Sequence, residues 1–350
     1  SFAYTTEEAH LILRPLYLEG IEPVGSLGDD TPLSALATKP RLIYSYFRQR
    51  FAQVTNPPID SYREHLVMSL YTYLGARKSL LSDSENHAEL IRLDSPILTN
   101  DQLNAIQSDK SSLNSVTLST LFEINEGYEG LKKALANLCK DAEAAIDLGA
   151  ELLILSDKGL SAQHAAIPML IAVGAVHHHL INARKRLQAS LIVQGGDARE
   201  MHQFALLIGY GASAINPYLA FETIKELIDQ GHDQEVGEQK ALETYVKTIN
   251  KQLLKIMSKM GISVISSYRG GCNFEAVGLS RAIVSDYFPG MSSRISGIGI
   301  SGIEEKIKDL HQKFSKKNVF TLPIGGLYRY RKSGENHQYQ GRLIHMLQTA

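Results

Sequence analysis

The sequence predicts an α/β fold in which βα repeats form a mostly parallel, barrel-like sheet, preceded by a helical, loop-rich N-terminal third. Two observations carry this prediction. From about residue 127 onward, stretches with helical periodicity alternate with short apolar runs, which is the pattern of βα units around a parallel sheet. Residues 1–110 show no sustained strand-type alternation and are interrupted by prolines. We therefore expect one domain over residues 1–350, with a wrapping region at 1–110 and a βα-repeat body at 111–350.

The first long helix of the repeat body is predicted after residue 127, because its apolar residues fall on one helical face. Gly149 stands where a residue in the left-handed conformation would end this helix. Residues 151–156 follow as a buried strand. The apolar face consists of Leu131, Leu135, Leu138, Ala142 and Ile146.

The same unit recurs along the rest of the body. Asp197 and Glu200 have the spacing of a capping box, so the turn at Gly195 and Gly196 is expected to lead directly into a helix. The predicted helices are 167–186, 197–210, 221–228 and 239–260, and the further predicted strands are 189–194, 212–215 and 262–266.

The composition is that of a globular chain of 350 residues, with 44% hydrophobic and 21% charged residues, enough to bury a sizeable core. The 36 lysines and arginines balance 37 aspartates and glutamates, so neither nucleic acid nor a membrane surface is expected as a partner. Cys139 and Cys272 lack a metal-ligand spacing, which fits a reducing compartment. No apolar run reaches the roughly 18 residues of a membrane span, and no signal-peptide pattern is present. We expect a cytoplasmic protein.

Polar groups follow several predicted strands, at the edge where α/β enzymes build their sites. One hypothesis is an independent α/β-barrel enzyme whose small-molecule site at the strand C-terminal ends uses Asp157, Asn216 and Arg269. It requires these side chains to converge. The turn at Gly195–Gly196 could instead hold a phosphate at a helix N-terminus. Asp197 occupies the position that an anion would take, so an ordinary helix cap is the favoured interpretation.

Two further motifs are weaker candidates for chemistry. His177, His178 and His179 point about 100° apart around a helix, so they cannot jointly ligate one metal, and a buried or interface role is favoured. Cys272 follows two glycines but has no histidine nearby in sequence, which favours a small core thiol over a nucleophile. No metal site is predicted.

The decapeptide FAQVTNPPID at residues 51–60 is the most distinctive motif. Pro57 and Pro58 fix the backbone, and Asn56 precedes a proline, which disfavours the helical conformation, so a rigid polar loop is expected. Together with six other segments, this motif resembles the central domain of glutamate synthase, a large ammonia-channelling flavoenzyme. The other segments, in order, are GSLGDD at 25–30, SPILTN at 95–100, ILSDKG at 154–159, AVHHHL at 175–180, GYGASAINPYL at 209–219 and KIMSKMGIS at 255–263.

The resemblance implies a role within a larger enzyme that makes L-glutamate from L-glutamine and 2-oxoglutarate. In that family FMN and an iron-sulfur cluster belong to other parts of the polypeptide, so this segment is expected to hold no catalytic residue and no cofactor. The implied partners are the glutaminase and FMN-binding domains of the same polypeptide.

The resemblance also points to a candidate site. Leu27, Thr55 and Asn56 match segments that help line the family's tunnel for ammonia, and methionine often stands in the family where this chain has Leu27. The alternative is that the Asn56 side chain satisfies local backbone groups in its turn.

Overall fold

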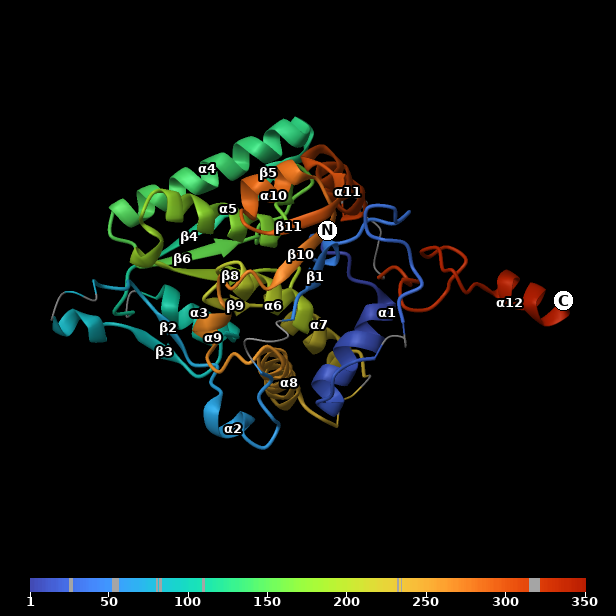
Figure 1. Ribbon diagram of the computed structural model, residues 1–350, viewed down its shortest axis with the longest axis horizontal. Helices are drawn as coiled ribbons and strands as arrows, with labels where there is room; N and C mark the ends of the chain where they lie inside the picture. The colour runs from blue at the N-terminus through green and yellow to red at the C-terminus, as the bar shows by residue number, and fades with distance from the viewer. Residues whose placement is uncertain are drawn as a thin grey trace.

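The computed structural model describes residues 1–24, 28–51, 57–79, 81, 84–108, 111–231, 233, 235–314 and 322–350. At its centre lies a parallel sheet in the order β4-β6-β8-β9 (Figure 1). Every residue of β6, β8 and β9 is buried, which explains why these strands are nearly continuous apolar runs. The predicted parallel α/β arrangement is confirmed in this sheet. Its strands are β4 (Ser115–Ser119), β6 (Leu152–Ser156), β8 (Ser190–Gln194) and β9 (Ala214–Asn216).

Long helices lie on both sides of this sheet. Figure 1 shows α4 (Gly127–Asp147) and α5 (Met169–Asn182) on one side and α8 (Glu238–Lys259) on the other. The five apolar residues predicted for the face of α4 are all buried, and Gly149 follows the helix with φ of 92°. A residue with a Cβ is strained in that conformation. Within the part of the chain that the structure describes, no helix combines the length and apolar character needed to cross a membrane.

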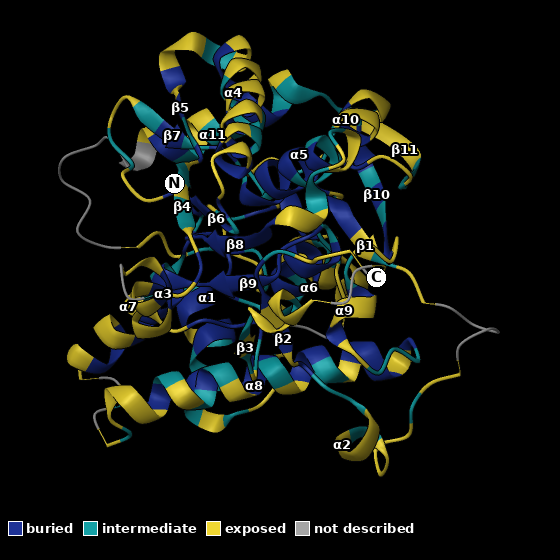
Figure 2. Cartoon of the chain, turned by 90° about the vertical axis from the view of Figure 1, so that its left-hand side faces the viewer, coloured by how far each residue is buried: buried dark blue, intermediate teal, exposed yellow. Residues whose placement is uncertain are grey.

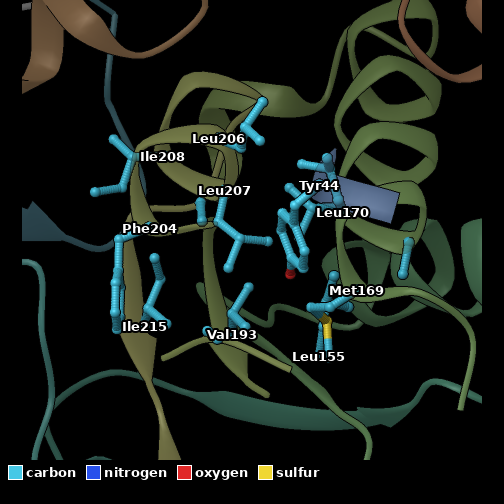
Figure 3. Close-up of a cluster of buried hydrophobic side chains, with 14 of the residues drawn as sticks. Tyr44, Leu155, Met169, Leu170, Val193, Phe204, Leu206, Leu207, Ile208 and Ile215 are labelled. Carbon is cyan, nitrogen blue, oxygen red and sulfur yellow. The ribbon is translucent and has the colours of Figure 1, made fainter. Parts of the chain in front are cut away.

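The core is continuous between the sheet and the helices above it. Figure 2 shows the central strands and α5 as buried, whereas the outer side of α8 is exposed. Tyr44 comes from the N-terminal third and packs among side chains of β6, β8 and α5 (Figure 3). The N-terminal region and the repeat body therefore share one core.

The barrel-like closure that the sequence predicted is not found among the described residues. A second sheet, in the order β1-β10-β11, pairs β1 antiparallel and β11 parallel to β10. The predicted strand 262–266 is wrong: Val264 forms one isolated bridge with Ser69, and the chain then turns into the short helix α9. The Ser69 amide donates to the Ser263 carbonyl, and the Ser69 carbonyl accepts from the Ile265 amide. Strand pairing on either side of Val264 therefore ends after one residue. The strands are β1 (Phe47–Gln49), β10 (Phe274–Leu279) and β11 (Ser292–Ile298).

The N-terminal third consists of short elements that wrap around the body. Its first helical segment begins at Thr6, after the Thr5 hydroxyl accepts a hydrogen bond from the Glu8 amide, and continues through two π-type turns to Glu19. The elements are α1 (Thr6–Glu8), the turns Ala9–Leu13 and Pro15–Glu19, α2 (Glu64–Val67), β2 (Thr72–Leu74), β3 (Ile91–Leu93) and α3 (Asn100–Gln107). The remaining elements of the body are β5 (Leu121–Glu123), β7 (His164–Ala166), α6 (Met201–Gly209), α7 (Tyr218–Asp229), α9 (Ile265–Tyr268), α10 (Arg281–Tyr287), α11 (Ile300–Phe314) and α12 (Gly341–Thr349).

The start of α6 differs from the prediction. The helix begins at Met201, and Asp197 does not cap it. The Gln203 side-chain oxygen instead accepts hydrogen bonds from the amides of Arg199 and Glu200, at 2.7 and 3.1 Å. Asp197 accepts a hydrogen bond from the Met169 amide at the start of α5. Asp197 and Glu200 have the spacing of a capping box, but the Asp197 side chain bonds to the start of α5 and does not cap α6.

Candidate functional site

The three residues suggested for the tunnel, Leu27, Thr55 and Asn56, lie outside the described residues. The described residues on both sides of Thr55 and Asn56 are anchored by backbone hydrogen bonds. The Arg50 amide donates to the Asn273 carbonyl at 2.8 Å, and the Ile59 amide donates to the Ser258 carbonyl at 2.8 Å. The segment therefore leaves from β1 and returns at the end of α8.

The carboxyl ends of β6 and β8 carry a buried pair of acids, Asp157 and Asp197. The Gly196 amide donates to Asp157 Oδ2 at 2.9 Å, and the Tyr218 hydroxyl donates to Asp157 Oδ1 at 2.9 Å. Asp157 and Asp197 are only 1% and 4% exposed, respectively. Burial, and then the charge of Asp197, raise the pKa of Asp157 to about 8, while burial raises that of Asp197 to about 6. Burial and the neighbouring acid thus favour the protonated form of Asp157.

The N-terminal segment covers this acid pair. A Cβ on Gly196 would lie 2.5 Å from the Phe2 ring, so the ring sits directly against the turn. Arg199 holds the segment in place, because its guanidinium donates to the Phe2 carbonyl at 2.9 Å and to Glu8 Oε1 at 2.7 Å. It also lies over the Tyr4 ring, 4.3 Å from the centroid.

This packing disfavours the phosphate hypothesis for the Gly195–Gly196 turn. The Gly196 amide is already bonded to Asp157, and the space beside it is filled by Phe2. The next helix along the chain does not begin until Met201, and the Met169 amide at the start of α5 already donates to Asp197.

Two hollows lie beside the covered edge. A cavity of about 50 Å³ has mostly apolar walls, with Asp197 and Arg41 among its lining residues. A wide, open groove of about 1400 Å³ runs along the N-terminal segment and includes Arg199 and Tyr218. The smaller cavity also contains Ser1 and His311, whose Oγ and Nδ1 atoms lie 3.1 Å apart.

The three side chains of the enzyme hypothesis do not converge. Asp157 lies at the carboxyl edge of the sheet, where Asn216 also lies, but the Asn216 amide donates to the Leu98 carbonyl and to Asn100. Arg269 lies at the opposite edge, since its Nε donates to the Ala212 carbonyl, just before β9 begins. The wrong strand prediction at 262–266 had placed Arg269 at the carboxyl edge.

The histidine run divides its side chains among different partners, as the helical spacing predicts. His177 Nδ1 accepts a hydrogen bond from Arg186 Nε at 2.8 Å, and His179 lies 2.8 Å from Glu143. Among the described residues, no group of three or more potential metal ligands occurs. Cys272 is exposed and has φ of 53°, so the prediction of a core thiol is wrong. It belongs to a left-handed turn before β10.

Comparison with known proteins decides the family. Residues 1–280 match the family model of the glutamate synthase central domain. The chain belongs to this family. The NADPH-type glutamate synthase large chain of Azospirillum brasilense is 46% identical over 350 residues, covering 100% of this chain and 23% of the relative. The large chain of Bacillus subtilis is 43% identical, with the same coverage of 100% and 23%.

The central domain thus spans about a quarter of the length of the curated relatives it matches. A third relative, the ferredoxin-dependent glutamate synthase 2 of Synechocystis, is 41% identical over all of this chain and 23% of its own length. Among solved structures, the flavin-binding domain of baker's yeast flavocytochrome b2 matches 81% of this chain and 92% of that domain, with 8% identity and a TM-score of 0.42. A likeness at that score carries no argument about function.

Proposed function

We propose that this central domain is a non-catalytic scaffold that links the glutaminase and FMN-binding domains of one cytoplasmic polypeptide and forms part of its ammonia tunnel wall. The polypeptide makes L-glutamate from L-glutamine and 2-oxoglutarate, with FMN and an iron-sulfur cluster held outside residues 1–350. The observation that carries the proposal is the match over the whole chain to about a quarter of each relative. Because its own N-terminal segment covers the acid pair at the strand ends, a scaffold role is supported over an independent enzyme.

The tunnel assignment rests on the resemblance of two segments to the family, and the chemistry of their residues is consistent with it. Ammonia must be kept from bulk water, where it would be protonated, so a tunnel wall should be mainly apolar with a few hydroxyl or amide groups. Leu27, Thr55 and Asn56 offer that mixture. The backbone bonds of Arg50 and Ile59 hold the two flanks of the segment that contains Thr55 and Asn56, one just before β10 and the other on α8.

In the full-length enzyme, Leu27→Trp or Asn56→Leu is expected to uncouple glutamine hydrolysis from glutamate synthesis. Added bulk at Leu27 should obstruct the bore, and loss of the Asn56 amide should remove a hydrogen-bonding group along the path. We expect roughly a twofold or greater fall in 2-oxoglutarate aminated per glutamine hydrolysed, because ammonia would be lost to bulk water. Glutamate formation from external ammonia should be spared, because the reacting groups lie elsewhere.

Two substitutions serve as controls. Leu27→Met keeps an apolar side chain of similar volume and should retain coupling. Leu36→Trp adds the same bulk as Leu27→Trp, but at a side chain that is 73% exposed, and should also retain coupling. If Leu27→Trp and Asn56→Leu both fold and both couple normally, the tunnel assignment is wrong.

The segment by itself is expected to bind no flavin and no iron. Its sequence contains neither a phosphate-binding glycine motif nor a cysteine cluster. The absorption spectrum of the purified chain should show only the protein band. Stoichiometric absorbance near roughly 450 nm would reveal a flavin site and revive the enzyme hypothesis.

A further inference from the structure

A cluster of positive side chains lies at the amino edge of the central sheet, opposite the covered acid pair. Arg186 and Arg269 are anchored on the carbonyls of two consecutive residues, Gly211 and Ala212. Arg186 Nη2 donates to the Gly211 carbonyl at 2.8 Å, and Arg269 Nε donates to the Ala212 carbonyl at 3.1 Å. The two guanidiniums therefore flank the same turn, and the side chain of neither is fully buried.

His177 completes the base of this cluster. A Cβ on Gly211 would lie 2.3 Å from His177 Nδ1, so the imidazole fits there only because residue 211 is glycine. Arg186 Nε donates to the same Nδ1 at 2.8 Å. Since a guanidinium only donates, Nδ1 carries no proton and the ring hydrogen is on Nε2. The rings of His177 and His178 lie edge to face, 5.0 Å apart.

Within the described part of the chain, neither Arg186 nor Arg269 forms a salt bridge, and no carboxylate shifts the pKa of His177, Arg186 or Arg269. Burial, and then Arg186, lower the pKa of His177 to about 3, with further lowering by His178 and Arg269. Burial and the charge of Arg269 lower the pKa of Arg186 to about 10. Burial and the charge of Arg77 likewise lower that of Arg269 to about 10.

The nearest acids on the adjoining helix are already engaged. Glu143 pairs with Lys185 at 2.9 Å and with His179 at 2.8 Å. Asp147 pairs with the same lysine at 2.7 Å. By contrast, the buried Arg199 at the other edge has Glu8 as its counter-ion. Partly desolvated guanidiniums without a counter-ion are costly, and an anion would relieve that cost.

We propose that Arg77, Arg186 and Arg269, with His177 and His178 beside them, bind an oxyanion of phosphate or carboxylate type at the amino edge of the sheet. Arg269 uses only Nε in its recorded bond, so its two terminal nitrogens are free to form a bidentate contact. Arg186 has three of its five N–H groups engaged, with His177, Ala189 and Gly211. The site gives a joint role to sequence segments at 175–180 and 209–219, which the scaffold function leaves unexplained.

The test is a titration of the purified protein with inorganic phosphate, followed by calorimetry, with sodium chloride used to match ionic strength. We expect saturable binding in roughly the millimolar range or tighter, because bidentate contacts of a guanidinium to an oxyanion are charge-assisted. Arg269→Ala should weaken binding by about tenfold, and Arg77→Ala by a smaller factor, because Arg77 is exposed and contributes mainly charge. Arg281→Ala, at an exposed position on α10, should leave it unchanged.

Arg186→Ala is not used because its three hydrogen bonds also hold the turn, and the variant could fail to fold. Circular dichroism should confirm that the Arg77 and Arg269 variants fold. A parallel titration with acetate separates the two ligand sources. Binding of phosphate alone would assign a free phosphate compound, and binding of both would also admit a carboxylate from a neighbouring polypeptide. The proposal fails if the protein binds neither anion saturably, or if Arg269→Ala binds phosphate as tightly as the unaltered protein.

Discussion

Replacing Arg199 by alanine is expected to lower the free energy of unfolding by about 3–5 kcal/mol, one of the largest effects available from a single side chain here. The Arg199 and Glu8 side chains are only 3% and 11% exposed, with 2.7 Å between their charged atoms. Removing the arginine leaves the Glu8 carboxylate buried without its partner. It also removes the donor to the Phe2 carbonyl and the cation over Tyr4.

A second ion pair provides a matched control. Lys255 and Glu22 also approach to 2.7 Å, but their side chains are 54% and 41% exposed. Lys255→Ala should therefore cost less than about 1 kcal/mol. Urea denaturation of both variants measures the difference. Equal losses in the two variants would show that the Arg199 pair does not hold the N-terminal segment, and would reopen the question of what the strand-end edge can bind.

Local patterns in the sequence predict the helices α4 to α8 and the strands β6, β8 and β9 of the repeat body, but not β4, β5, β7, β10 or β11. The apolar face of α4 and the left-handed Gly149 follow from helical spacing alone. The buried strands β6 and β8 lie within one residue of their predicted bounds. These elements are determined by nearby residues, so a single sequence contains the necessary information.

Features that depend on distant residues were not predictable in the same way. Arg199 and Glu8 are separated by 191 residues, and no local spacing connects them. The contact of Phe2 with Gly196 is equally remote in sequence. The segment at 262–266 is apolar enough for a strand, but a strand needs a partner, and Ser69 supplies only one paired residue. Without that strand, the predicted barrel closure and the placement of Arg269 both failed.

The candidate sites show the same division. The tunnel residues came from resemblance to a family, and neither periodicity nor composition would have selected Leu27 or Asn56. The histidine run was noticed in the sequence, but its partner Arg186 was not. Only the close approach of His177 to Gly211 reveals why that glycine is needed and why the two motifs belong together.

The stability of the domain is expected to fall as pH rises between about pH 6.5 and about pH 8, because of the acid under Phe2. The folded state raises the pKa of Asp157 to about 8. In the unfolded chain an aspartate loses its proton near about pH 3.9. The folded state therefore binds more protons than the unfolded state between these values, and stability is lost with rising pH until the folded-state pKa is passed.

Histidines oppose this trend only at lower pH. Burial lowers the pKa of His177, His178 and His202, so these groups add stability as pH rises towards about pH 6.5 and little above it. Above that value the slope from Asp157 should be visible. At about 1.4 kcal/mol per pH unit, it amounts to roughly 2 kcal/mol by about pH 8.

Asp157→Asn isolates the contribution of this carboxyl group. The asparagine side chain cannot ionise. Placed at the Oδ1 position, its single oxygen can accept from the Tyr218 hydroxyl and from the Gly196 amide, which lie 2.9 and 3.2 Å from Oδ1. Urea denaturation at several pH values should show that the slope above about pH 6.5 is largely lost and that the variant is the more stable protein near about pH 8. Glu151→Gln, at a partly buried position just before the amino end of β6, should keep the original slope. An unchanged slope in Asp157→Asn would mean that this carboxyl is ionised in the folded protein, and that the edge beneath Phe2 admits water.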